Sequence, residues 1–442
     1  MKNWQKKYCL ILLPIACFVA ISHCSGAGYY IDSISGSDKN SGRSGTFPWK
    51  SHTKVNSLKL KPGDIVYFKK GSTFSGPIKL SQSGTKKRRI KLTSYGKGER
   101  PKFTNPKDSN MNGNCIRISG SYVIIDGLHF HDTPGTRNAR RISSLFLMGA
   151  IYNMHGAMHN VIRNNVFMKC TKAIQSTGEY TLVTKNYMDG PSHQLWITKN
   201  KKSSWGPMGI QLGIGNQEVS YNTIKNYLTL DSPYGSDGGA IELDDGRYHK
   251  DNFYIHHNFS EGNAGFIESS WNADNNPFVQ EVHNLRVSFN ICHDGQAWLY
   301  MWAPCHDTYF DNNTIIRDKR FGSPLNSGAV VNFPGITFRN NLFAYTSSGH
   351  PYQGKGSRKC VKTSNWYLNI NKYSAVYWDK KQAGSGDPLL VDLKKGNYHL
   401  TAKSPLRGKA KNLSDTYSVD FDGKRLRKTG NWDIGALQYS KK

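Results

Sequence analysis

The sequence predicts an all-β protein built as a parallel β-helix. Two observations indicate this fold: one strand-and-turn pattern recurs every few tens of residues, and its apolar residues alternate with a period of two. The seven repeats are VIRNNVF (161–167), LVTKNYM (182–188), VSYNTI (219–224), YIHHNF (254–259), VSFNI (287–291), YFDNNTI (309–315) and ITFRNNLF (336–343). Repetition at this spacing is typical of a solenoid in which each coil buries its apolar edge against the next.

The asparagine in each repeat is expected to lie in a turn and to stack on the asparagine of the next coil. Its amide can bond backbone groups of the neighbouring coil, so a buried polar side chain keeps its hydrogen bonds. Six such positions are Asn165, Asn186, Asn222, Asn258, Asn290 and Asn313. A fold of this kind presents long, flat, ridged faces that suit an extended polymer.

Residues 1–27 are predicted to be a signal peptide. Three lysines precede an apolar stretch at 10–21 that is too short to span a membrane, and small residues follow at 25–27 for cleavage. Cys24 leaves a lipid anchor open as an alternative. We expect a secreted or periplasmic protein without a membrane span, or one that is lipid-anchored at the cell surface.

The charge of the chain indicates a polyanionic partner. It has 59 Lys and Arg against 31 Asp and Glu, a net charge of +28, and loss of the lysines of the leader leaves about +25. No nucleic-acid recognition motif is found, and an aromatic content of 12% suits stacking on sugars. The expected partner is therefore an acidic polysaccharide. The five cysteines after the leader form no CxxC pair, so neither a zinc site nor a full disulfide framework is predicted.

Both ends of the chain after the leader resemble a known group of enzymes. The opening YYIDSISGSDKNSGRSGTFPWK and the tail DPLLVDLKKGNYHLTAKSPLRG are similar to the cap and the closing coils of the pectate-lyase-like superfamily of secreted polysaccharide-degrading enzymes. The resemblance implies a single-stranded right-handed β-helix over 28–442. Its parts would be a cap and first coils (28–105), central coils with loop insertions (106–345), and C-terminal coils with a tail (346–442). One compact unit of this kind is expected to be a monomer.

Alignment of the repeats predicts which side chains share the outer face of one sheet. An apolar residue that should point into the core follows each ladder asparagine, directly or after an insertion: Ile174, Ile210, Ile241, Ile267, Leu299 and Val330. Ile151 follows Gly127 in the same way. The next residues then form an outward column of Gln175, Gln211, Glu242, Glu268 and Tyr300. Two residues further along lie Thr177, Gly213, Asp244, Ser270 and Trp302.

The acidic members of this column predict a site. Neighbouring coils lie about 4.8 Å apart, so Glu242 and Glu268 should be adjacent, with Asp244 beside them. Like charges this close are unfavourable unless a cation or a shared proton intervenes. A calcium ion held by the three carboxylates satisfies this condition, and so does a carboxyl pair of the glycosidase type. A structural ion pair with Arg247 or Lys250 is the third possibility.

Four of these coils carry an insertion between the ladder turn and this strand. The inserted loops are therefore expected to line one edge of the same face. They carry basic residues that would bind an anionic chain, among them Arg140, Arg141, Lys201 and Arg320. Gln211, Trp271 and Trp302 are further candidates for substrate binding.

The stretch Glu242-x-Asp244, with Arg247 and Lys250 after it, resembles the metal-and-base strand of the chondroitinase B and alginate lyase family. The resemblance implies that Glu242 and Asp244 hold Ca²⁺ and that Lys250 or Arg247 removes the proton. This chain has Glu268 where that family has an arginine. β-Elimination needs a base within reach of the uronate C5 proton, and His249 and Tyr300 are also candidates.

The sequence therefore predicts a secreted lyase that cleaves an acidic, uronic-acid-containing polysaccharide, with sulfated glycosaminoglycans among the candidate substrates. Two alternatives stay open. A glycoside hydrolase or epimerase could use Glu242, Asp244, Asp245 and Glu268, since Asp244-Asp245 and Arg317-Asp318-Lys319 resemble motifs of the polygalacturonases. The other alternative is a non-catalytic glycan-binding solenoid.

Overall fold

The computed structural model describes residues 26–105, 113–133, 147–191, 196–197, 204–244, 247–270, 281–318, 327–370, 379 and 381–441. The predicted leader, with Cys24, lies outside these residues apart from its last two positions.

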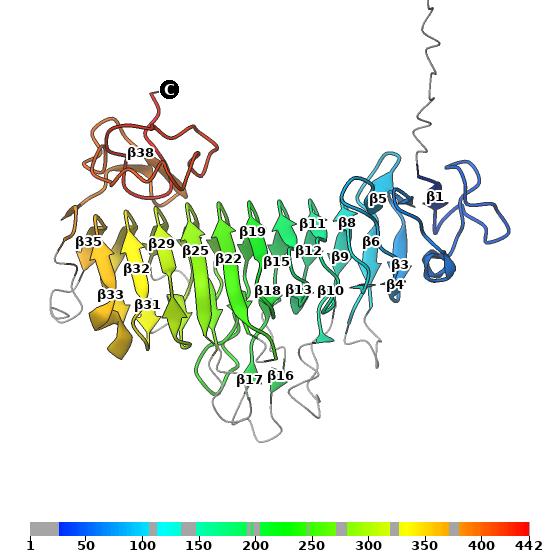
Figure 1. Cartoon of the computed structure of the whole chain (residues 1–442), viewed down its shortest axis with the longest axis horizontal. Helices are drawn as coiled ribbons and strands as arrows, with labels where there is room; N and C mark the ends of the chain where they lie inside the picture. The colour runs from blue at the N-terminus through cyan, green and yellow to red at the C-terminus, as the bar shows by residue number, and fades with distance from the viewer. Residues whose placement is uncertain are drawn as a thin grey trace, which may run out of the picture.

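Three long parallel sheets wind around one axis, which confirms the predicted all-β parallel β-helix (Figure 1). Sheet A contains β1 (Gly28–Ile31), β2 (Ile65–Lys69), β5 (Ile90–Tyr95), β8 (Val123–Asp126), β11 (Val161–Arg163), β14 (Leu182–Thr184), β19 (Gln217–Ser220), β22 (Lys250–His256), β25 (Val282–Ser288), β28 (Cys305–His306), β29 (Thr308–Asp311), β32 (Ile336–Arg339) and β34 (Val361–Thr363).

Sheets B and C complete each coil. Sheet B contains β3 (Thr73–Ser75), β6 (Lys102–Thr104), β9 (His129–His131), β12 (Val166–Met168), β15 (Tyr187–Asp189), β20 (Thr223–Lys225), β23 (Phe259–Glu261), β26 (Ile291–His293), β30 (Thr314–Arg317), β33 (Leu342–Gln353), β35 (Trp366–Ile370) and β36 (Gly384–Ser385). Sheet C contains β4 (Ile78–Leu80), β7 (Ile116–Ile118), β10 (Ile151–Asn153), β13 (Lys172–Ser176), β18 (Met208–Leu212), β21 (Gly239–Leu243), β24 (Ile267–Ser269), β27 (Ala297–Met301) and β31 (Ser327–Val331), and the long β33 also joins it.

The predicted asparagine ladder forms the turn between sheets A and B. Asn258 is typical: its Nδ2 donates to the Val219 carbonyl at 2.9 Å and to Asn290 Oδ1 at 3.0 Å, and its Oδ1 accepts the backbone N–H of Asn222 at 3.0 Å. The ladder continues through Asn341 and Asn365. The residue before each ladder asparagine has φ of 52 to 59°, which turns the chain sharply: Asn164, Lys185, Tyr221, His257, Phe289, Asn312, Asn340 and Ser364.

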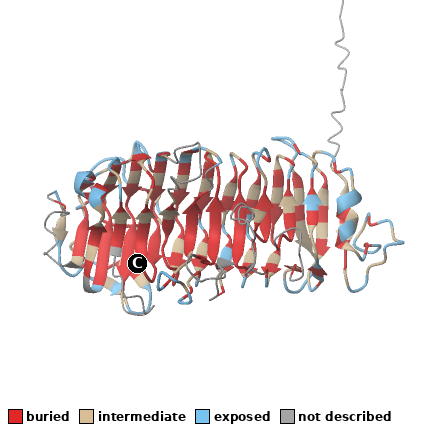
Figure 2. Ribbon diagram, turned by 90° about the horizontal axis from the view of Figure 1, so that it is seen from below, coloured by how far each residue is buried: buried red, intermediate tan, exposed pale blue. Residues whose placement is uncertain are grey.

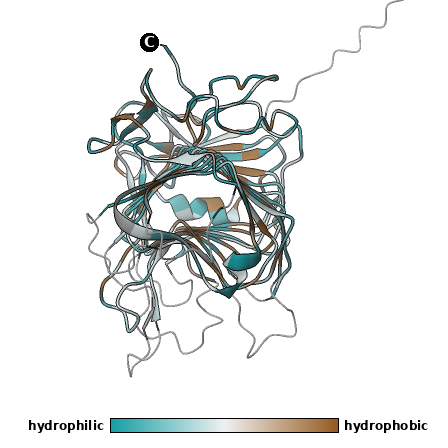
Figure 3. Cartoon of the chain, turned by 90° about the vertical axis from the view of Figure 1, so that its left-hand side faces the viewer, coloured by the Kyte–Doolittle hydropathy of each residue, from teal (hydrophilic) through white to brown (hydrophobic). Residues whose placement is uncertain are grey.

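Apolar side chains fill the space enclosed by the sheets. Phe130 stacks between Phe103 and Phe167, with ring centroids 5.8 and 4.9 Å apart. Figure 2 shows buried residues along the strands and exposed ones gathered at the turns and ends. At the N-terminal end a 3₁₀ helix, η1 (His52–Ser57), covers the first coils, with His52 packed on Phe74. Figure 3 looks along the axis and shows the sheets surrounding this interior.

The C-terminal segment differs from the sequence prediction of closing coils. Coil strands end at β36, and residues 387–441 form a lobe whose described strands are only the antiparallel pair β37 (Leu390–Asp392) and β38 (Asn397–Leu400). The lobe packs on the outside of the later coils (Figure 1). Tyr417 donates to Asp311 Oδ2 at 2.7 Å, and Thr314 Oγ1 accepts the backbone N–H of Ala436 at 2.9 Å. The C-terminal lobe therefore covers an outer face of the later coils and does not extend the solenoid.

The four insertions enter where the sequence predicts. They lie between β9 and β10, β15 and β18, β20 and β21, and β30 and β31, always between a strand of sheet B and the following strand of sheet C. The second insertion includes a hairpin of β16 (Trp196–Ile197) and β17 (Ser204–Trp205), which projects from the lower side in Figure 1.

Two smaller expectations concern membranes and thiols. Among the described residues, no helix has the length and apolar character needed to cross a bilayer. The cysteines at 115, 170, 292, 305 and 360 are all buried free thiols, as expected from their spacing.

Candidate active site

The register of sheet C confirms the predicted outward column. Gln175 pairs with Gln211, Gln211 with Glu242, Glu242 with Glu268, and Glu268 with Tyr300. One alignment is wrong by a residue: Leu299 pairs with Ala329, so Val330 lies in the outward column and Ala329 in the core. The insertion before β31 changed the count that the sequence alignment assumed.

The column continues toward the N-terminus with residues that the sequence reasoning missed. Tyr152 precedes Gln175, Arg117 precedes Tyr152, and Lys79 precedes Arg117. Tyr152 could have been placed from the sequence, because its neighbour Ile151 was already assigned to the core. Arg117 lies four coils from Glu242, roughly 19 Å along the axis. The face therefore changes from basic residues near its N-terminal end to acidic residues at Glu242 and Glu268.

The outward side chains at the middle of this face are buried, since all five residues of β13, β18 and β21 are buried. Lys172, on β13, donates to Gln175 Oε1 at 3.0 Å and also to Gln211 Oε1. Its ammonium lies 5.7 Å from the ring centre of Trp205 on the β16–β17 hairpin. Lys172 was not among the predicted site residues, because its position in the strand suggested no outward role.

Polar atoms without a partner gather on this column. Gln175 Nε2, Gln211 Nε2, Glu242 Oε2 and the Tyr300 hydroxyl are shielded from solvent, and none of them has a hydrogen-bond partner among the described residues. Buried polar groups are normally paired, and leaving one unpaired costs ~1–3 kcal/mol. An orphaned set on one face is therefore the arrangement expected where a polar ligand completes the bonding.

The two glutamates share an unusual electrostatic environment. Burial, together with the Glu268 and Asp244 charges, holds the pKa of Glu242 well above its usual range, and Lys172 opposes this shift. Burial and the Asp237 and Asp244 charges raise the pKa of Glu268 to about 7, although the indole N–H of Trp302 donates to its Oε1 at 2.9 Å. Like-charged carboxyl groups on neighbouring coils cannot both ionise easily, so the pair retains a proton near neutral pH.

Asp237 is an acidic neighbour that the sequence reasoning did not single out. It lies in the turn before β21, where Ser204 donates to its Oδ2 at 2.7 Å, and burial raises its pKa. Its charge raises the pKa values of Glu242, Glu268 and Tyr300. The insertion between β20 and β21 brings Asp237 close to the column. The period-two pattern of the strands does not predict where an insertion places its residues.

Two aromatic residues form one side of the acidic pair. Tyr300 and Trp302 lie on and just after β27, with rings stacked 5.5 Å apart at 17°. Both are partly exposed. Burial and the Glu268 charge raise the pKa of Tyr300, so its phenol is neutral at ordinary pH. A flat apolar pair beside carboxyl groups is suited to a sugar ring.

The predicted bases are placed differently from the column. Lys250 is 1% exposed, at the start of β22 in sheet A, and its ammonium donates to the Gly213 carbonyl at 2.9 Å and the Tyr248 carbonyl at 2.8 Å. This geometry ties two coils together, and the prediction that Lys250 is a free base is not supported. Arg247 and His249 are exposed, with Arg247 over the Tyr248 ring at 5.2 Å. Of the four predicted bases, only Tyr300 lies in the column.

Arg317, the first residue of the Arg317-Asp318-Lys319 motif, is bonded to backbone carbonyls of the solenoid. It is 2% exposed, and its guanidinium donates to the backbone carbonyls of Asp294, Gly295 and Gln296. Arg317 therefore stabilises a turn of the solenoid.

Several predicted residues lie outside the described part of the chain. They are Asp245, Trp271 and the basic loop residues Arg140, Arg141, Lys201 and Arg320.

The donor set of the acidic cluster fits the predicted calcium ion in type. Glu242, Asp244 and Glu268 offer hard carboxylate oxygens, and the unpartnered Glu242 Oε2 is buried. The same residues also fit a carboxyl pair that shares a proton. Geometry alone therefore allows two chemistries at one place.

Comparisons with known proteins agree with the fold. No family model matches the chain. A stretch of 106 residues, 21% of the chain, is 36% identical to a lacto-N-biosidase of Bifidobacterium longum subsp. longum and spans 7% of that protein. The structure is similar to that of pectate lyase Pel9A (TM-score 0.55, 15% identity, 94% of this chain and 97% of that chain). It is also similar to XylC in complex with xylose (TM-score 0.53, 12% identity, 94% and 99%). At these identities the two structures show a shared parallel β-helix alone.

Proposed function

We propose that this protein is a carbohydrate-active enzyme that hydrolyses a glycosidic bond in an acidic polysaccharide, with Glu242 and Glu268 as its catalytic pair. The observation that carries the proposal is the pairing of these carboxyl groups on neighbouring coils, both with raised pKa. Strands about 4.8 Å apart match the ~5 Å carboxyl separation of retaining glycosidases. The local similarity to a lacto-N-biosidase also supports action on a glycan.

The order in which the pair loses protons gives each residue its role. Glu268 has a pKa of about 7, whereas the more deeply buried Glu242 is held well above its usual range. Glu268 therefore ionises first and acts as the nucleophile at the anomeric carbon. Glu242 keeps its proton and gives it to the departing glycosidic oxygen. The Glu268–Trp302 hydrogen bond stabilises the ionised form that this role requires.

The acidic character of the substrate is supported by charge. The chain has a net charge of +28, and the outward column continues from the carboxyl pair to Tyr152, Arg117 and Lys79. A polysaccharide lying along the coils would place carboxylate or sulfate groups over these cations. The predicted signal peptide is consistent with action outside the cell.

Calcium-assisted β-elimination is the second candidate, because Asp244 and Asp237 add acids to the pair. Glu242, Asp244 and Glu268 would hold the ion, which when bound would neutralise the uronate carboxylate. Tyr300 would face the C5 proton, since its hydroxyl lies in the column without a partner. Gln211 and Trp302 would orient the sugar.

One assay separates these reactions. Acidic polysaccharides are incubated with the enzyme, with and without chelator, while ultraviolet absorbance and reducing ends are followed. We expect reducing ends to rise without an absorbance change and without loss in chelator. A rise in absorbance would report the unsaturated uronide made only by elimination, and its loss in chelator would support the calcium ion. Binding of the glycans without either signal would indicate a non-catalytic solenoid.

A further inference from the structure

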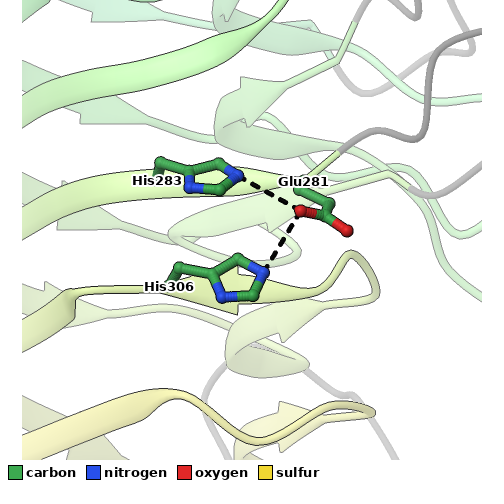
Figure 4. A group of neighbouring side chains, drawn as sticks. All are labelled: Glu281, His283 and His306. Carbon is green, nitrogen blue, oxygen red and sulfur yellow. Dashed lines mark hydrogen bonds and ion pairs between the residues drawn. The ribbon is translucent and has the colours of Figure 1, made fainter.

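A second cluster of ligand side chains lies away from the acidic column, on the outer face of sheet A (Figure 4). Glu281 immediately precedes β25, His283 is on β25, and His306 is its register partner on β28. Both imidazoles direct Nε2 at the same carboxylate oxygen, Glu281 Oε2, at 3.2 Å each. The rings are stacked with centroids 4.6 Å apart at 19°, so the two nitrogens point in the same direction.

The spacing of these atoms matches that of ligands around a small ion. Ligand nitrogens and oxygens lie about 2.0–2.1 Å from a tetrahedral zinc ion, which puts neighbouring ligand atoms about 3.3 Å apart. The two observed Nε2–Oε2 separations of 3.2 Å are therefore close to the spacing that one zinc ion requires of its ligand atoms. Hydrogen bonds from neutral imidazole N–H groups to the carboxylate would give the same distances, and the zinc titration described below distinguishes the two arrangements.

We propose that Glu281, His283 and His306 form a binding site for a divalent transition-metal ion, with Zn²⁺ as the best match. Two imidazoles and one carboxylate are the donor set that such ions prefer, whereas calcium takes oxygen ligands alone. The side chains are 38%, 47% and 50% exposed respectively, so the fourth coordination position faces solvent. The site is separate from the acidic cluster in both position and ligand chemistry.

The fold explains why these residues meet. Parallel register stacks His283 directly against His306, and the rigid solenoid fixes this spacing without the metal. Glu281 reaches the same face from the position immediately before β25. A bound ion would link two consecutive coils. The two strands that it links, β25 and β28, follow the strands that carry Glu268 and Tyr300.

The test uses the untagged chain without its leader, stripped with chelator and titrated with zinc chloride alone in a calorimeter at pH 7.5. We expect one strong site per chain, with affinity at least about tenfold weaker in His283→Gln or His306→Gln and the site lost in the double variant. Co²⁺ in place of zinc should give visible d–d absorption bands that the double variant lacks.

The matched control is His131→Gln, which removes a partly exposed histidine that contacts one carboxylate, Asp132, at 2.7 Å. No second imidazole contacts that oxygen within the described part of the chain. This variant should bind zinc as the parent does. Equal affinity and stoichiometry in the parent and the double variant would overturn the proposal, as would the absence of a strong site in the parent. Circular dichroism verifies that each variant is folded. Glycan cleavage is a separate readout, so failure here leaves the proposed hydrolase untouched.

Discussion

Two columns of buried polar side chains run along the same coils, and they differ in how completely their hydrogen bonds are made. In the asparagine ladder, Asn258 donates to a carbonyl and to the next asparagine and accepts from the previous one. In the column of sheet C, Gln175, Gln211, Glu242 and Tyr300 each keep a shielded polar atom without a partner.

We interpret this difference as one between polar groups that stabilise the fold and the proposed substrate-binding groups. Both columns arise because parallel register stacks equivalent positions, so burial and repetition alone do not distinguish them. A satisfied polar column stabilises the fold, whereas each orphaned group costs ~1–3 kcal/mol. Proteins tolerate unpaired buried polar groups at positions where a bound ligand supplies the missing hydrogen bonds. The predictions that follow test this contrast.

The largest effect is expected for Glu242→Gln. The amide cannot deliver the proton that Glu242 holds through its raised pKa, so kcat should fall by roughly 10³-fold or more, the scale of losing a principal catalytic group. The thermal midpoint should not fall, because an unfavourable carboxyl pair is removed. Steady-state kinetics and thermal unfolding measure both.

The control for this variant is Glu218→Gln on sheet A, where Glu218 Oε1 contacts His256 Nε2 at 3.2 Å, away from the column. It should keep the parental rate. If Glu242→Gln retains more than a tenth of kcat, the proposed catalytic pair is wrong.

Asn258→Ala should have the opposite signature, a loss of stability with catalysis preserved in the folded molecules. The substitution removes two donated bonds and orphans the Asn222 backbone N–H, which should cost ~3 kcal/mol in the free energy of unfolding. Denaturant unfolding gives the value. Asn56→Ala, at an exposed asparagine that bonds the Pro77 carbonyl, is the comparison and should cost less than ~1 kcal/mol.

The sequence was sufficient for the ladder and for most of the column, because both follow from a period of two and a recurring asparagine. Glu242, Glu268 and Tyr300 were placed together from spacing alone. The spacing gave a wrong assignment where an insertion interrupts the repeat. The insertion before β31 shifts the alignment by one residue, so Val330, which was expected in the core, lies on the other face of the strand.

Other features could not be predicted because long-range packing decides them. The sequence offers Lys250 as a cation near acids, yet its ammonium bonds backbone carbonyls of the neighbouring coil and of its own turn. Asp237 reaches the column by a bend in an insertion, and the cluster at Glu281 needs two coils in register. The tail carries strand-like segments, but it covers the outer face near Thr314 instead of adding coils.

Glu268→Gln should change how stability depends on pH. The pKa of Glu268 rises from 4.5 to about 7 in the folded protein, chiefly through burial and the Asp237 charge. Between these values the folded state holds a proton that the unfolded state releases, so stability falls as pH rises through this window. The variant removes that loss and should be ~1–3 kcal/mol more stable than the parent at pH 8, with little difference at pH 4. Denaturant unfolding at the two pH values decides, and an equal difference at both would contradict the raised pKa.

The smallest effect on stability, and the sharpest contrast between bonded and orphaned groups, is expected from two tyrosine variants. The Tyr300 hydroxyl has no partner, so Tyr300→Phe should leave the free energy of unfolding unchanged or raise it by up to ~1 kcal/mol. In the folded enzyme the same change should lower kcat/KM about 10-fold, because the substrate loses a hydrogen bond.

Tyr367→Phe is the matched control: its hydroxyl donates to Asp379 Oδ2 at 3.0 Å and lies 2.9 Å from the Tyr352 hydroxyl. That variant should lose ~1–2 kcal/mol of stability and keep its kcat/KM. If Tyr300→Phe destabilises as much as Tyr367→Phe while activity is unchanged, the orphaned column is structural, and the distinction between the two columns does not hold.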